Sequence, residues 1–135
     1  MMLCICYAYL IYGMEIEMLT REELQTAQDF LAAAEQEFAL GNLEAGSERI
    51  GDAAVAAVRA VVKRRGWPCE NGDDLYKAAK RLDEESGDGM AIQMGLRAAR
   101  AGVGRVKHGL MEPEDAWADM ISVRHFIGLL QELAD

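Results

Sequence analysis

The stretch that decides the fold is residues 43–67, LEAGSERIGDAAVAAVRAVVKRRGW. Apolar residues recur along it at helical spacing: Leu43, Ile50, Ala54, Ala57, Val58 and Val61. Small residues lie beside this stripe, and they let a neighbouring helix approach closely: Gly46, Ser47, Gly51, Ala53, Ala56 and Ala60. The pattern predicts one long helix that begins after Gly41-Asn42, ends at Gly66 and occupies the centre of a helical bundle.

A second helix is predicted upstream of this one. Residues 20–23, TREE, have the form of a capping box, so a helix start is expected at Thr20. An apolar stripe follows in steps of three and four: Leu24, Ala27, Leu31, Ala34 and Phe38. The connection through Gly41-Asn42 is so short that the two helices must form an antiparallel hairpin.

Three more helices are expected downstream, over about residues 74–85, about residues 90–108, and from Pro113 to the C-terminus. Glycines at 95, 102 and 104 weaken the middle one, by up to about 1 kcal/mol each against Ala. They imply either tight packing or a kink. In the last helix we expect Trp117, Ile121 and Leu133 to widen the buried stripe. The predicted fold is all-α, an up-and-down bundle of four to five helices.

Composition limits the domain organisation and the location of the protein. We expect an apolar N-terminal extension over residues 1–19 and a single helical-bundle domain over residues 20–135. The run 1–14 is too short to span a bilayer and lacks the features of a secretory signal. It is interpreted as an extra packed element, a dimer contact, or the result of a translation start placed upstream of Met14 or Met18. The odd count of three cysteines favours a reducing cytoplasm.

One stretch reverses the overall charge. The chain carries a formal net charge of −9, which opposes general attraction to nucleic acid or anionic lipid. Between Gly89 and Leu110, however, there are no acidic residues, and the basic residues gather there: Arg97, Arg100, Arg105, Lys107 and His108. Helical spacing puts Arg100 and Lys107 on one flank and Arg105 outward. These five residues are the candidate binding site for phosphate or RNA. The alternative is a solvated face that pairs with acidic residues of a neighbouring helix or subunit.

Candidate catalytic residues are few. His108 and His125 are the only histidines, so any imidazole acid or base must be one of them. His108 lies near a predicted helix C-terminus, where a capping role is the simpler interpretation. His125 is expected on the surface of the last helix. Neither has the neighbours of a zinc site, and no phosphate-cradling loop or nucleophile elbow is present, so no metal and no cofactor is predicted.

Residues 41–67 resemble the HEPN-like superfamily of small helical bundles, in particular its archaeal and bacterial subfamilies. The resemblance depends on Gly41-Asn42 followed by Gly46-Ser47-Glu48-Arg49, and on the helix exit at residues 62–67, VKRRGW. It extends over about residues 20–135 and is strongest over 38–85. It implies a bundle of four or five helices that pairs as a homodimer.

Many members of that superfamily are RNases, often toxins neutralised by a nucleotidyltransferase-type partner. Their motif is an Arg followed by a His after four to six intervening residues. Here Arg105 precedes His108 with two residues between them, and Arg100 precedes it with seven, so the motif is absent.

Three functional hypotheses follow from the sequence. The first is a non-catalytic, homodimeric nucleotide- or RNA-binding or protein-interaction module. The second is a metal-independent RNase that uses His108 with Arg105 or Arg100. The third is a pure assembly partner of another protein.

Overall fold

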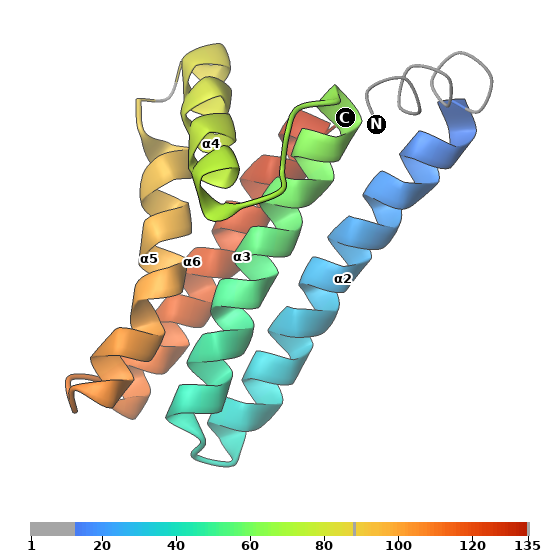
Figure 1. Cartoon of the computed structure of the whole chain (residues 1–135). Helices are drawn as coiled ribbons and strands as arrows, with labels where there is room; N and C mark the ends of the chain where they lie inside the picture. Colours follow the sequence, from blue (N-terminus) through green and yellow to red (C-terminus); the bar gives the residue numbers. More distant parts are fainter. Residues whose placement is uncertain (1–12, 88, 135) are drawn as a thin grey trace.

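The computed structural model describes residues 13–87 and 89–134, and in these residues the chain forms five helices and no strand (Figure 1). The helices are α2 (Gly13–Ala39), α3 (Leu43–Arg65), α4 (Gly72–Ser86), α5 (Ala91–Lys107) and α6 (Pro113–Ala134). The predicted all-α helical bundle is confirmed. The apolar run at residues 1–12 lies outside the described residues, and the domain boundary at residue 20 stays a prediction.

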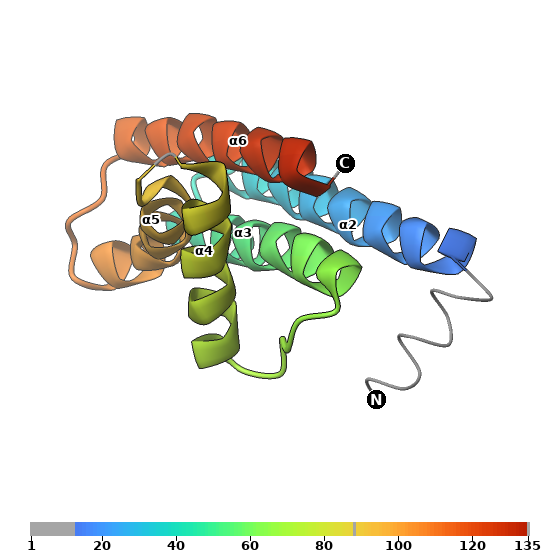
Figure 2. The same cartoon turned by 90° about the horizontal axis from the view of Figure 1, so that it is seen from above.

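Four of the helices alternate in direction. In Figure 1, α2 and α5 run downward while α3 and α6 run upward. The shorter α4 lies at a steep angle to α3, as the view in Figure 2 also shows. The central position predicted for residues 43–65 is confirmed, because α3 packs against α2, α4, α5 and α6. The backbones of α2 and α5 do not meet anywhere in the described part of the chain, so one side of α3 lies between them without a covering helix.

The C-terminus of α3 forms where the sequence predicts it. Gly66 adopts the left-handed conformation, with φ 69°. Its N–H donates to the Lys63 carbonyl at 3.1 Å, and the Trp67 N–H donates to the Val62 carbonyl at 3.1 Å. These two bonds form a Schellman motif, for which glycine is the preferred residue because it lacks a Cβ.

Arg65 then ties this end of α3 to two other helices. Its guanidinium pairs with Glu85 of α4 and donates to the Leu133 carbonyl of α6 at 3.2 Å. It also lies 5.3 Å from the centre of the Trp67 ring. The RRGW exit therefore has a structural role in this chain.

Two of the small residues are needed for close packing against aromatic rings. A Cβ on Gly46 would lie 2.3 Å from the Phe38 ring of α2, and a Cβ on Gly95 would lie 2.4 Å from the Phe126 ring of α6. Of the two alternatives considered for the glycines of α5, tight packing or a kink, Gly95 shows tight packing. Gly104 differs, because no atom comes within 4 Å of a Cβ placed there.

A buried carboxylate fixes the start of α5. Asp83 of α4 is only 2% exposed, and it accepts hydrogen bonds from the N–H groups of Ile92 and Gln93 at 2.7 and 3.0 Å. The Gln93 side-chain amide adds a third bond, at 3.0 Å. The residue at the N-cap position itself, Met90, provides no side-chain cap. The first turn of α5 is therefore capped by the preceding helix.

Two expectations from the sequence are wrong. Helix α2 begins at Gly13, so residue 20 lies inside it and is not its first cap. The residues just upstream, 14–19 MEIEML, favour helix, and the helix continues through them. Ile121 does not widen the buried stripe of α6, since it is 68% exposed, and Trp117 is 42% exposed with one edge against Phe38. Ile121 comes two residues before the buried Val123, about half a helical turn away, so its side chain projects from the opposite side of α6.

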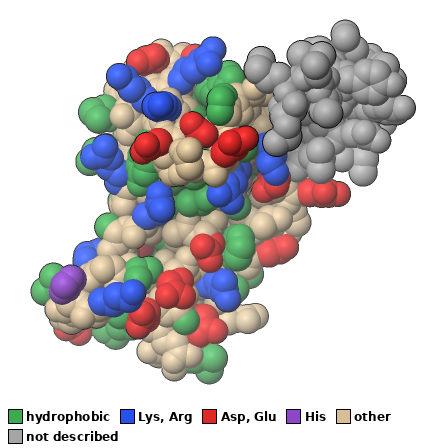
Figure 3. All heavy atoms as spheres, in the orientation of Figure 1, with side chains coloured by type: hydrophobic (Ala, Val, Ile, Leu, Met, Phe, Trp, Pro, Cys, Tyr) green, Lys and Arg blue, Asp and Glu red, His purple; other side chains and the backbone are tan. Residues whose placement is uncertain are grey.

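Among the described residues, none of the helices combines the length and the apolar character that a membrane crossing requires. On the face shown in Figure 3, Lys and Arg side chains are interspersed with Asp and Glu. The net negative charge is therefore mixed with local positive groups on this face.

Candidate ligand site

The predicted basic stretch of α5 separates into three environments. Arg97 and Arg100 both lie over Tyr76 of α4, each guanidinium carbon 5.7 Å from the ring centre. A cation over a tyrosine face is attracted by the ring quadrupole. Within the described residues neither arginine forms an ion pair. These two guanidinium groups therefore have no carboxylate to displace before they bind an anion.

Arg105 and Lys107 have carboxylate partners. Arg105 was expected to face outward, but it is partly buried and pairs with Asp119 of α6, with 2.5 Å between Nη2 and Oδ2. The expectation failed because the turn into α6 brings Asp119 against the last turn of α5. Lys107 Nζ lies 3.9 Å from Oε1 of Glu44 on α3. These two residues therefore fit the alternative considered for this stretch, in which the basic residues pair with acidic residues of neighbouring helices.

Asp119 is the one described group whose pKa is clearly shifted. Burial disfavours its charged form and raises its pKa above the ordinary value of 3.8. The pairing with Arg105 acts in the opposite direction and offsets the effect of burial only in part, while Asp115 adds a smaller upward contribution. The Arg105–Asp119 pair is thus a packing contact between α5 and α6.

His108 is exposed and directly follows α5. Its N–H donates to the Gly104 carbonyl at 3.1 Å, which places it at the C-cap position expected from the sequence. His125 is exposed on α6. The five predicted residues therefore differ in their contacts. The structure brings Arg97 and Arg100 together over Tyr76, pairs Arg105 and Lys107 with carboxylates, and places His108 at the end of α5.

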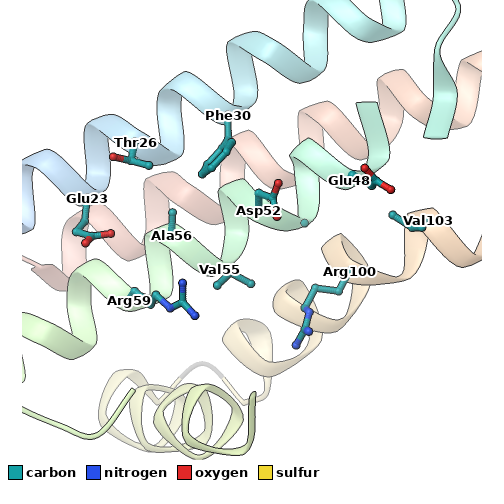
Figure 4. A pocket seen from close by; sticks show the side chains of 11 residues that line it. Glu23, Thr26, Phe30, Glu48, Asp52, Val55, Ala56, Arg59, Arg100 and Val103 are labelled. Atoms are coloured by element: carbon teal, nitrogen blue, oxygen red, sulfur yellow. The ribbon is translucent and has the colours of Figure 1, made fainter. Parts of the chain in front are cut away.

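A groove lies where α2 and α5 are held apart. It has a volume of about 550 Å³, and α3 forms its floor. Its lining comes from three helices: Glu23, Thr26, Phe30, Glu48, Gly51, Asp52, Val55, Ala56, Arg59, Arg100 and Val103. Figure 4 shows Phe30 reaching down from α2, with Arg59 of α3 and Arg100 of α5 on either side of Val55. The volume is in the range of small-molecule sites.

The charges of the groove are unevenly compensated. Glu23 pairs with Lys63, and Asp52 pairs with Arg49 at 3.4 Å. Neither Arg59 nor Arg100 forms an ion pair with any described residue. Two of the three acids of the groove are thus paired, while Glu48 and the two arginines have no ion-pair partner among the described residues. Arg59 and Arg100 offer positive charge to an anionic group between α3 and α5.

Sequence reasoning identified Arg100 but missed Arg59 and Phe30. A signal for Arg59 was available, because it is the one charged residue between Asp52 and Lys63 on the otherwise small and apolar central helix. No signal marked Phe30, whose position depends on the gap between α2 and α5. Among the described residues, no three His, Cys, Asp or Glu side chains are grouped so that they could hold a metal ion.

The fold has a solved neighbour. A crystal structure of a protein from Sulfolobus solfataricus superposes with a TM-score of 0.69 at 16% sequence identity, covering 82% of this chain and 97% of that chain. At this identity the likeness shows a shared helical-bundle fold. No protein-family model and no curated protein matches the sequence.

Proposed function

We propose that this protein is a non-catalytic, HEPN-like helical module that binds a nucleotide in the groove between α2 and α5. The observation that carries the proposal is the pair Arg59 and Arg100, two guanidinium groups without carboxylate partners in the described structure, at a groove lined by both polar and apolar side chains. Arginine recognises phosphate through charge-assisted, often bidentate hydrogen bonds.

The remaining lining suits the rest of such a ligand. Phe30 and Val55 offer apolar surface on which a base could lie, and Arg97 and Tyr76 extend the basic region beyond Arg100. The acidic residues of the groove and the net charge of −9 oppose a long polyanion. These features favour a mononucleotide over an extended RNA strand.

The same residues argue for binding without turnover. The Arg–His spacing of the HEPN RNases is absent, and Arg105, the nearest arginine upstream of His108, is held by Asp119. The alternative, an RNase that uses His108 with Arg105 or Arg100, needs the histidine and the arginine at one site. Arg100 lines the groove, and His108, at the C-cap of α5, is not among the residues that line it. The proposal includes a homodimer. A nucleotidyltransferase-type partner stays a prediction that co-purification from the native host would test.

The test is calorimetric titration of AMP, and separately of a mixed-sequence 12-nucleotide RNA, into the wild type and four variants. Arg59→Ala and Arg100→Ala should each weaken AMP binding about tenfold, and the double variant should abolish it. Lys80→Ala is the control, because it removes one positive charge from an exposed position of α4 that does not line the groove. Binding that is equal in all variants, or no AMP binding by the wild type, would contradict the proposal. RNA affinity well above that for AMP would redirect it to RNA.

A second measurement addresses catalysis directly. The same RNA is incubated with wild type and His108→Ala in chelator. We expect no cleavage by either protein. Cleavage by the wild type that the His108→Ala variant lacks would establish the RNase alternative.

A further inference from the structure

Helix α6 carries a second row of residues beside its buried stripe. Trp117, Ile121, Arg124, Gly128 and Gln131 repeat in steps of four and three, which is the spacing of a helix-packing seam. Trp117 packs one edge against Phe38 of α2, and Arg124 pairs with Glu35 of α2. Ile121 is exposed, unlike the buried positions Val123, Ile127 and Leu130. An isoleucine that is 68% exposed within such a row is better explained by a contact outside the chain than by the bundle itself.

Gly128 at the middle of this row makes room for no side chain among the described residues. A Cβ placed there would meet no atom within 4 Å, whereas Gly46 and Gly95 each make room for an aromatic ring. Glycine within a helix costs about 1 kcal/mol relative to alanine. A shallow hollow of about 650 Å³ surrounds it, and its described lining comes from α6 alone: Ile121, Arg124, His125, Leu129, Gln131 and Glu132. Such a site would let a second helix approach the backbone closely.

The charges on either side of Gly128 are self-complementary. Arg124 lies four residues before it and Glu132 four residues after it. If two α6 helices cross antiparallel at Gly128, Arg124 of one copy faces the partner's Glu132, and the symmetric pair forms as well. His125 and Gln131, three residues to either side, meet in the same way. An isologous contact requires this kind of pairing, in which one patch complements itself.

We propose that two copies of this chain associate through α6, antiparallel and crossing at Gly128. The inference rests on the homodimer included in the proposed function and assigns it a surface. In the described part of one copy, Arg124 pairs with Glu35 of α2 at 3.7 Å, with both side chains 56% exposed. An exposed pair of this kind contributes little to stability, so Arg124 can exchange it for a partner across the interface at small cost.

The experiment is light scattering of the whole protein over a concentration series, with circular dichroism confirming that each variant is folded. Wild type should be dimeric. Arg124→Glu and Glu132→Arg should each raise the dimer dissociation constant about tenfold or more, because each places like charges opposite one another twice. The double variant Arg124→Glu/Glu132→Arg restores opposite charges and should regain most of the affinity. Lys80→Glu reverses a charge at an exposed position of α4 and should leave the dissociation constant unchanged.

Gly128→Leu gives an independent readout, since its side chain would hold the two helices apart. We expect it to be monomeric and helical. A dimer insensitive to every α6 variant would overturn the α6 surface and leave the homodimer standing. Failure of the double variant to recover would overturn the antiparallel register. A wild type that is monomeric at about 100 µM would overturn both, and AMP titration of that same monomer would show separately whether the groove still binds its ligand.

Discussion

The packed side of the bundle and the open groove are built on opposite principles. Where α5 meets α6, and where α2 meets α3, backbones come so close that Gly95 and Gly46 are pressed against aromatic rings. Between α2 and α5 the helices stay apart, and α3 presents small, apolar and charged residues to the gap. On the packed side, the side chains contact one another. In the groove, two arginines have no ion-pair partner among the described residues. The packed side therefore specifies the fold, and the groove has residues available to a ligand.

The largest effect is expected on the packed side, from Gly95→Ala. Its Cβ would lie 2.4 Å from the Phe126 ring, so the ring or the helix must move, at a cost of about 2–3 kcal/mol. Urea denaturation measures the loss. Adding Phe126→Leu to this variant should recover part of the stability. An unchanged unfolding free energy for Gly95→Ala would show that α5 and α6 are not so closely packed.

Asp83→Ala should lower the free energy of unfolding by a smaller amount, about 2 kcal/mol, because three donors at the start of α5 lose their shared acceptor. Asp83→Asn keeps one acceptor oxygen and should lose less. The neighbouring exposed Glu84→Ala serves as the control and should be close to wild type in thermal unfolding. Equal unfolding temperatures for Asp83→Ala and Glu84→Ala would show that Asp83 does not stabilise the start of α5.

Beside the groove, replacing glycine by alanine should raise the free energy of unfolding instead of lowering it. A Cβ on Gly51 would lie 3.6 Å from the Ala99 carbonyl oxygen, an ordinary contact, so Gly51→Ala should stabilise the protein by about 0.5–1 kcal/mol. Gly104→Ala, with no atom within 4 Å, should show the same gain. Chemical denaturation of both variants checks this. Destabilisation by Gly51→Ala alone would mean that α3 and α5 are as tightly packed beside the groove as α5 and α6 are elsewhere.

The smallest effect is a pH dependence at the α5–α6 contact. The pKa of Asp119 is raised by burial, so the folded state binds this proton more readily than the unfolded state does. This carboxyl therefore makes unfolding free energy fall as pH rises from about 4 through its raised pKa. Asp119→Asn should remove that slope. Urea titrations of both proteins between about pH 4 and pH 7 test it, and parallel curves would contradict the assignment.

Much of the fold could be predicted from the sequence because its signals are local. Gly66 with the preceding basic turn marks the end of α3, and Pro113 marks the start of α6. The start of α2 could not be located in this way. A capping-box sequence at residue 20 does not end a helix when the residues before it also favour helix.

The candidate site could be predicted only in part, because its properties depend on distant residues. The sequence identifies Arg100 and Arg105 as equally basic. In the fold, Asp119 of α6 pairs with Arg105, and Arg100 has no carboxylate partner among the described residues. The groove itself exists because α2 and α5 fail to meet, and no short motif encodes a gap between two helices.

The carboxylate of Asp83 has a consequence for the dynamics of the chain. Because the amides of Ile92 and Gln93 are protected by a residue of α4, the first turn of α5 cannot persist once α4 detaches. The two helices should then open and close as one cooperative unit. In hydrogen exchange, the Ile92 and Gln93 amides would report the departure of α4, with the same opening free energy as the amides of α4 itself. The stretch of α5 that bears Arg97 and Arg100 would thus be held in place by a neighbour, and its motion would follow that neighbour.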